Sequence, residues 1–99
     1  MDIQVALDLF KKSGFTVSQA CQARLQAEIV DPVNDAVARN RQRKEPEKKI
    51  REIEARGKSH MHLVVKRMIE EGKKLRSPTL DEQVFEEAGK ALGPLRPLD

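Results

Sequence analysis

The sequence predicts an all-α fold, a small bundle of five or six short helices with a basic central segment. Apolar residues recur at spacings of three and four along most of the chain, and no stretch alternates as a strand would. Helix start and stop signals separate these periodic stretches. With 99 residues, 38% of them hydrophobic, we expect one domain with a thin core, residues 1–93, and a C-terminal tail, residues 94–99.

Residues 2–13 are expected to form the first helix, because apolar side chains recur at helical spacing and Gly14 follows as a stop signal. The second helix, residues 17–30, follows a capping box made by Thr16 and Gln19. Its apolar face consists of Val17, Cys21, Leu25 and Ile29, spaced four apart.

A third helix, residues 32–44, is expected to begin at Asp31-Pro32, because Asp caps a helix and Pro fits its first turn. Its C-terminal end is basic, which also suits the helix dipole. Glu45 and Pro46 then interrupt the helix, since Pro lacks a backbone N–H and disfavours helical geometry in the residue before it.

Gly57 leaves two alternatives open. Either it ends a short helix that began at Pro46, and Ser59 caps the next one, or a single long helix continues to Glu71 and resembles a dimerisation arm. The break is favoured, because a glycine inside a helix costs about 1 kcal/mol and Ser59 is a ready cap.

The last helix, residues 80–92, is expected after a second capping box made by Thr79 and Glu82. Gly93 and Pro94 end this helix, because Gly favours a helix C-terminus and Pro cannot continue it. The proline-containing residues beyond them are expected to be extended.

Positive charge is concentrated in the middle of the chain. Residues 1–38 hold three basic and five acidic side chains, residues 39–76 hold fourteen and six, and residues 77–99 hold two and five, for a net charge of +3. Within the middle third, residues 39–51 form what we call the basic segment. Such clustering suits a polyanion, because each neutralised phosphate releases condensed counterions.

Amide side chains are interleaved with the arginines of the basic segment, so that base edges as well as phosphates could be contacted. A second basic loop follows the densest apolar run and could contact the same backbone. The candidate nucleic-acid-binding residues are Arg39, Asn40, Arg41, Gln42, Arg43, Lys44, Lys48, Lys49 and Arg51, with Lys73, Lys74 and Arg76 in the second loop.

Enzyme signatures are missing from the sequence. There is no glycine-rich phosphate loop and no nucleophile in a recognisable setting. His60 and His62 lie two residues apart and would point to different sides of a helix, so they are not expected to chelate a metal. Cys21, the single cysteine, is expected to be a small buried hydrophobe. We therefore expect neither catalysis nor a metal or cofactor.

Residues 13–21, with the sequence SGFTVSQAC, resemble the first helix of helix-turn-helix units in transposase-type regulators. The resemblance covers about a dozen residues and ends at Arg24, where such units have the glycine of their turn. A unit of this kind that placed residues 32–44 in a DNA groove would need an unusually long connecting helix. No family is assigned from it.

Two classes of function remain. The favoured one is a non-enzymatic regulatory or accessory protein that binds duplex DNA, because a chain without Trp or Tyr has few platforms for stacking single-stranded bases. The alternative is a small helical adaptor or inhibitor that docks its basic segment on an acidic protein, with Met61, Met68 and Phe85 as apolar anchor.

The thin core suggests a homodimer. Without a membrane span, a signal peptide or a second cysteine, the protein is expected to be cytoplasmic.

Overall fold

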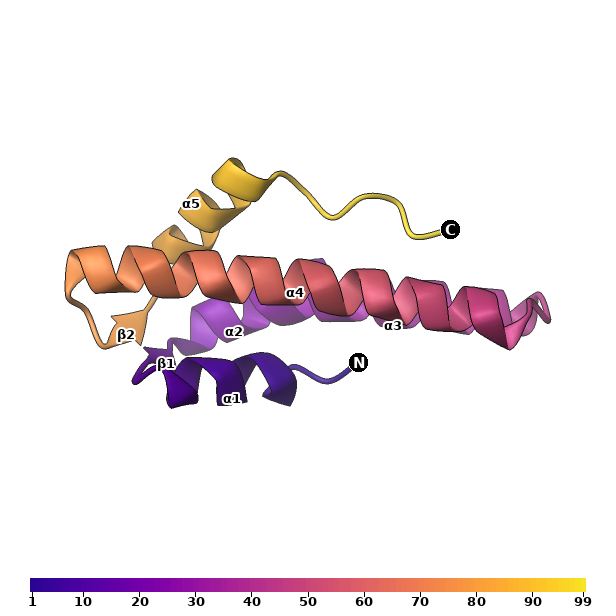
Figure 1. Cartoon of the computed structure of the whole chain (residues 1–99), viewed down its shortest axis with the longest axis horizontal. Helices are drawn as coiled ribbons and strands as arrows, with labels where there is room; N and C mark the ends of the chain where they lie inside the picture. The colour runs from indigo at the N-terminus through magenta and orange to yellow at the C-terminus, as the bar shows by residue number, and fades with distance from the viewer.

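The computed structural model describes residues 1–99 and is dominated by a long antiparallel helical hairpin, with a smaller helix on each side of it (Figure 1). One arm of the hairpin is α2, η1 and α3 in succession, and the other is α4. In chain order the elements are α1 (Gln4–Lys12), β1 (Thr16–Val17), α2 (Gln19–Leu25), the π-helical turn η1 (Gln26–Val30), α3 (Asp31–Gln42), α4 (Glu47–Leu75), β2 (Thr79–Leu80) and α5 (Glu82–Leu92). The all-α class is confirmed, but the expected five or six short helices are in fact four continuous helical rods.

No new helix starts at Asp31-Pro32, where the sequence predicts one. The chain stays helical there, because η1 widens the helix and the Asp31 N–H donates to the Gln26 carbonyl. A π turn suits this position, since Pro32 has no N–H to donate and its ring would crowd the carbonyl one turn earlier in a regular α-helix. The helix also continues past Arg24, so no helix-turn-helix forms at the segment that resembles one.

Gly57, where the sequence favours a break, does not interrupt the helix. Gly57 lies buried inside the unbroken α4. A Cβ at this position would lie 2.9 Å from Cγ1 of Val33 on α3, and closer still to its Cγ2. The glycine is therefore the residue that lets the two arms approach closely. Tertiary packing of α3 on α4 outweighs its low helix propensity.

The two predicted capping boxes do not form. Thr16 and Thr79 lie opposite each other in a short parallel pairing of β1 with β2, and their hydroxyl oxygens are 3.1 Å apart. Neither threonine caps a helix. Ser18 caps α2 by accepting from the Cys21 N–H, and Asp81 caps α5 by accepting from the Gln83 and Val84 N–H groups in its first turn. The pairing thus fixes the N-termini of α2 and α5 side by side.

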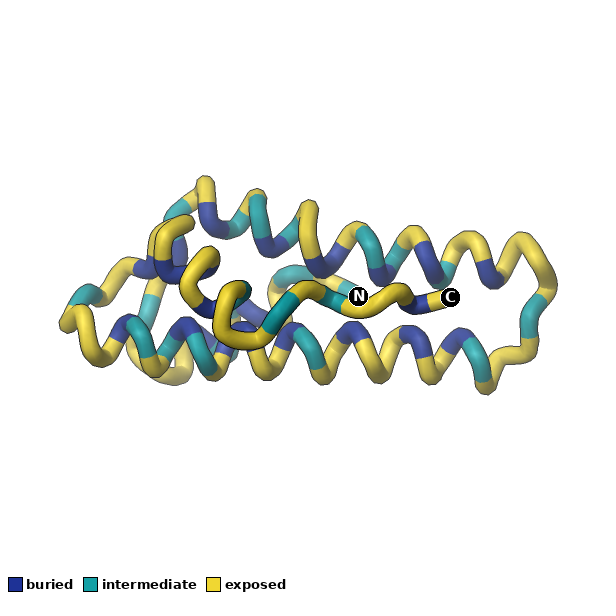
Figure 2. The backbone as a smooth tube through the Cα atoms, turned by 90° about the horizontal axis from the view of Figure 1, so that it is seen from above, coloured by how far each residue is buried: buried dark blue, intermediate teal, exposed yellow.

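The core is uneven along the hairpin. A cluster of fifteen buried residues fills the end at which α1 and α5 pack on the arms. Toward the tip, a second cluster contains only Val33, Ala36, Ile53 and Leu98. Figure 2 shows buried positions facing inward along both arms, with the C-terminal tail lying over the gap between them. Leu98 of that extended tail thus completes the sparse part of the core. None of the helices combines the length and apolar character that crossing a membrane requires.

Candidate nucleic-acid interface

The basic segment forms the tip of the hairpin. The turn after α3 closes with two backbone hydrogen bonds, from the Lys44 N–H to the Arg41 carbonyl and from the Glu45 N–H to the Asn40 carbonyl. This is a Schellman ending, in which Lys44 takes the left-handed conformation with φ of 57°. Pro46 then precedes the first turn of α4. The segment therefore reverses the chain and places its side chains on both arms.

Four of the seven cations in the basic segment have carboxylate partners. Arg39 and Arg43 both contact Asp99. In addition, Arg41 lies 3.4 Å from Glu47 and Lys49 lies 3.7 Å from Glu45. No carboxylate lies within ion-pair distance of Lys44, Lys48 or Arg51. The tip is thus less basic in the folded protein than its composition indicates.

The two amide side chains expected to contact base edges differ in their exposure to solvent. Gln42 is exposed at the end of α3. Asn40 is fully buried, and its Nδ2 donates to the Ala36 carbonyl at 2.7 Å while its Oδ1 has no partner. Asn40 therefore cannot reach a base edge while the tip stays folded, which corrects that part of the expectation.

The second basic loop lies at the other end of the molecule. Lys73 and Lys74 belong to the last turn of α4, and Arg76 follows it. At 1.5 Å per residue, Lys48 and Lys74 are about 39 Å apart along the helix axis. The two clusters therefore do not form one local site, and Lys74 is also engaged by Glu71.

The basic residues that the structure aligns instead lie along the solvent face of α4. When the residues of α4 are projected along the helix axis, with a rotation of about 100° from each residue to the next, eight of them fall within an arc of about 80° on one side of the helix. Five of these eight are Lys or Arg and none is acidic. We call the five cations the α4 stripe: Lys48, Arg51, Lys58, Lys66 and Lys73.

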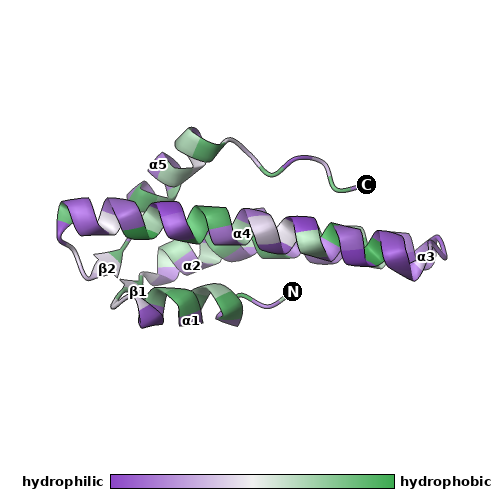
Figure 3. Cartoon of the chain, in the orientation of Figure 1, coloured by the Kyte–Doolittle hydropathy of each residue, from purple (hydrophilic) through white to green (hydrophobic).

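All five side chains of the α4 stripe are exposed, and none has a carboxylate within 4 Å. The remaining positions of the arc are Ala55, His62 and the half-buried Ile69. The stripe is about 37 Å long at 1.5 Å per residue. Figure 1 shows α4 at the front of the molecule with no other helix drawn before it, and Figure 3 shows hydrophilic turns alternating with more hydrophobic ones along it.

Sequence reasoning missed Lys58 and Lys66 because it favoured a break at Gly57. If the helix broke there, residues before and after the break would share no common face. The available signal was the spacing of three, seven, eight and seven residues between successive members of the stripe, which keeps them on one side of a helix.

The apolar anchor expected for a protein partner is not on the surface. Met61, Met68 and Phe85 are all buried, and Phe85 lies beneath the guanidinium of Arg24 at 5.1 Å. The large exposed apolar side chains on α4 are instead Leu63 and Leu75, with 53% and 64% of their surface accessible. The proposed Met and Phe anchor is therefore wrong, because these side chains hold the helices together.

Cys21, His60 and His62 are the remaining side chains with potentially reactive groups. Cys21 is buried, and burial raises the pKa of its thiol to about 12, with nearby Asp81 adding to the shift. The expectation of a small buried hydrophobe is confirmed. His60 is half-buried, which lowers its pKa, whereas His62 is exposed. No three His, Cys, Asp or Glu side chains come together in a way that could hold a metal ion.

Comparisons with protein-family models, with curated proteins and with solved structures find no match for this chain.

Proposed function

We propose that the protein is a non-enzymatic regulatory or accessory protein that binds duplex DNA through its α4 stripe, with the unpaired Lys44 of the hairpin tip beside it. The observation that carries the proposal is the α4 stripe itself. Five cations without carboxylate partners on one exposed helix face form a surface for which a polyanion is the best-suited partner.

The shape of this surface favours a duplex over a single strand. A rigid helix of 29 residues presents the cations in a straight row, and a duplex is the stiff polyanion that can meet such a row along its length. The three Phe side chains offer no stacking platform, since Phe10 and Phe85 are buried and Phe15 packs against the core. Phosphate contacts of this kind position a protein without reading sequence.

Salt dependence supplies a quantitative test. If all five cations of the α4 stripe contact phosphates, the logarithm of the binding constant should fall with the logarithm of salt concentration with a slope of about −4.5. Affinity would then drop about 500-fold between 50 and 200 mM salt. Fluorescence anisotropy with a mixed-sequence duplex measures both quantities.

A pair of double variants locates the contacts. Lys58→Gln with Lys66→Gln removes two cations of the stripe and should reduce the slope by about 1.8. Lys11→Gln with Lys12→Gln makes the same change in net charge at exposed, unpaired lysines of α1 and should leave the slope unchanged. Equal losses in both variants, or no binding of the wild type at 50 mM salt, would refute the proposal.

A second candidate is a small adaptor or inhibitor that binds an acidic protein surface. It is supported by exposed apolar side chains beside the stripe, because Leu63 and Leu92 line one shallow pocket with Leu95 of the tail. Binding of this kind should respond to Leu63→Ser, which leaves phosphate contacts untouched.

The homodimer suggested by the thin core stays a prediction, and sedimentation equilibrium of the free protein checks it.

A further inference from the structure

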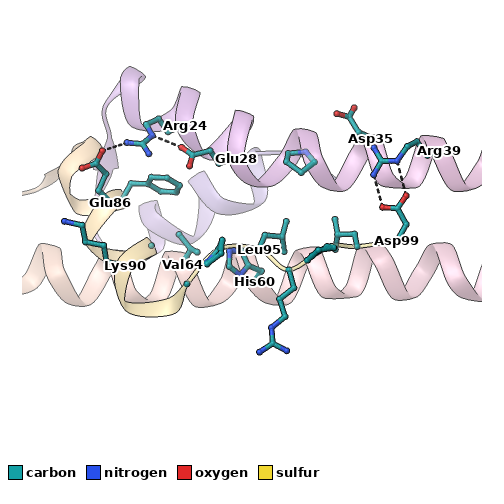
Figure 4. Close-up of a pocket in the computed structure, with 18 residues that line it drawn as sticks. Arg24, Glu28, Asp35, Arg39, His60, Val64, Glu86, Lys90, Leu95 and Asp99 are labelled. Atoms are coloured by element: carbon teal, nitrogen blue, oxygen red, sulfur yellow. Dashed lines mark hydrogen bonds and ion pairs between the residues drawn. The ribbon is translucent and has the colours of Figure 1, made fainter.

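Residues 93–99 form a strap that runs back along the hairpin toward its tip (Figures 2 and 4). The strap leaves α5 at Gly93, whose φ of 78° lies in the left-handed region that favours glycine. It borders an open pocket of about 1020 Å³ whose walls include Arg24, Asp35 and His60. The strap thus spans a partly empty space before it reaches the tip.

Two side chains at the far end of the strap hold it in place. Leu98 is buried against Val33, Ala36 and Ile53 between the arms. Asp99 accepts two hydrogen bonds from Arg39, from Nε at 3.0 Å and from Nη2 at 2.9 Å. Figure 4 shows Asp99 and Arg39 pointing toward each other.

The rest of the strap is loosely held. No backbone–backbone hydrogen bond joins residues 94–99 to the body of the protein. Between Gly93 and Leu98, the one side-chain hydrogen bond is from Arg56 Nη2 to the Pro97 carbonyl at 3.0 Å. The strap can therefore leave its place between the two arms without breaking any helix or strand.

The Asp99 contact has the geometry with which arginine also holds a phosphate. A guanidinium binds either a carboxylate or a phosphate through two parallel N–H donors, and here Nε and Nη2 of Arg39 use that arrangement. Arg43 approaches the same carboxylate, with its Nη1 3.6 Å from Oδ2. Both arginines keep about half of their side-chain surface exposed, whereas Asp99 keeps 18%. A phosphate can thus approach them from solvent.

We infer that Arg39 and Arg43 form a phosphate-binding site for the nucleic-acid backbone, which the strap occupies in the free protein with Asp99 in the place of the phosphate. This inference rests on the proposed function and adds a regulated contact to it. A duplex that engages the tip displaces Asp99 and gains two cations. While the strap is docked, the duplex meets mainly the α4 stripe.

Three single variants of the full chain test the inference by anisotropy with a 20-base-pair mixed-sequence duplex at several salt concentrations. Asp99→Asn removes the competing charge, and the slope should steepen by as much as about 1.8, or 0.9 for each released arginine. Leu98→Ser removes the apolar anchor without changing net charge and should steepen the slope in the same direction. Asp8→Asn makes the same charge change on exposed α1 and should leave the slope as it is.

A further substitution identifies the contact. Arg39→Gln placed in the Asp99→Asn background should cancel about half of the gain in slope, because one released cation is then missing. If the wild type binds through the α4 stripe but Asp99→Asn behaves like Asp8→Asn, the strap inference alone is overturned. If no variant binds the duplex at low salt, the proposed function is overturned and this inference falls with it.

Discussion

Gly57→Ala tests the close approach of α3 and α4 at the glycine inside the unbroken α4. Alanine gains about 1 kcal/mol of helix propensity over glycine. Its Cβ, however, would lie 2.9 Å from Cγ1 of Val33 and closer to Cγ2, and Val33 is fully buried. A β-branched side chain has little rotamer freedom in a helix, so relieving this contact costs about 1–3 kcal/mol of overpacking. We expect a net loss of about 1 kcal/mol in the free energy of unfolding.

The matched control is Gly89→Ala in α5, where a Cβ would meet no atom within 4 Å. The free energy of unfolding of this variant should rise by about 0.5–1 kcal/mol. The two alanine variants should therefore differ by about 2 kcal/mol in free energy of unfolding. Urea unfolding followed by circular dichroism measures the difference, which should separate their midpoints by about 0.7–2 M.

A double-mutant cycle assigns the cost to the contact. Val33→Ala removes both γ-methyl groups, so Gly57→Ala should no longer destabilise the protein in that background. Stabilisation of the wild type by Gly57→Ala to the same extent as by Gly89→Ala would refute the close approach of the two arms at this position.

Two further predictions concern titratable side chains. Cys21 should react with a thiol reagent at pH 8 only as fast as the protein opens, because its buried thiol has a pKa of about 12, and full reactivity should appear in urea. Burial lowers the pKa of His60 from its ordinary value of 6.5, so its neutral form should contribute full stability above pH 6.5. That contribution should be lost as the pH falls through the lowered pKa. His60→Gln should reduce this loss, and His62→Gln, at an exposed site, should not.

Much of the local structure follows from the sequence alone. The helical class follows from the three-and-four spacing of apolar residues, a property of each segment by itself. The end of α1 at Gly14 follows because its left-handed φ of 83° is accessible to glycine without strain. The buried state of Cys21 follows from its place on the apolar face of one helix. Each of these features depends on neighbours within about two turns of the chain.

Only the tertiary structure decides whether a weak break signal takes effect. Pro32 suggests the start of a new helix and Gly57 suggests the end of one, yet both lie within continuous helices. A π turn accommodates the proline, and Val33 packs against the glycine in the space that a side chain would have filled. The stability gained by packing two long arms together exceeds the local cost of about 1 kcal/mol that propensity assigns to such a glycine.

The candidate site likewise has some features that the sequence determines and others that only the tertiary structure determines. Clustering of positive charge in residues 39–76 is a property of composition and can be read from the chain directly. The sequence does not show which cations remain without a carboxylate partner, because Asp99 contacts Arg39 and Arg43 from some sixty positions away in the chain. The α4 stripe likewise exists only because α4 is unbroken, which brings Lys48 and Lys73 onto one face. Pairing between distant charges and helix continuity both depend on packing, so no local pattern determines them.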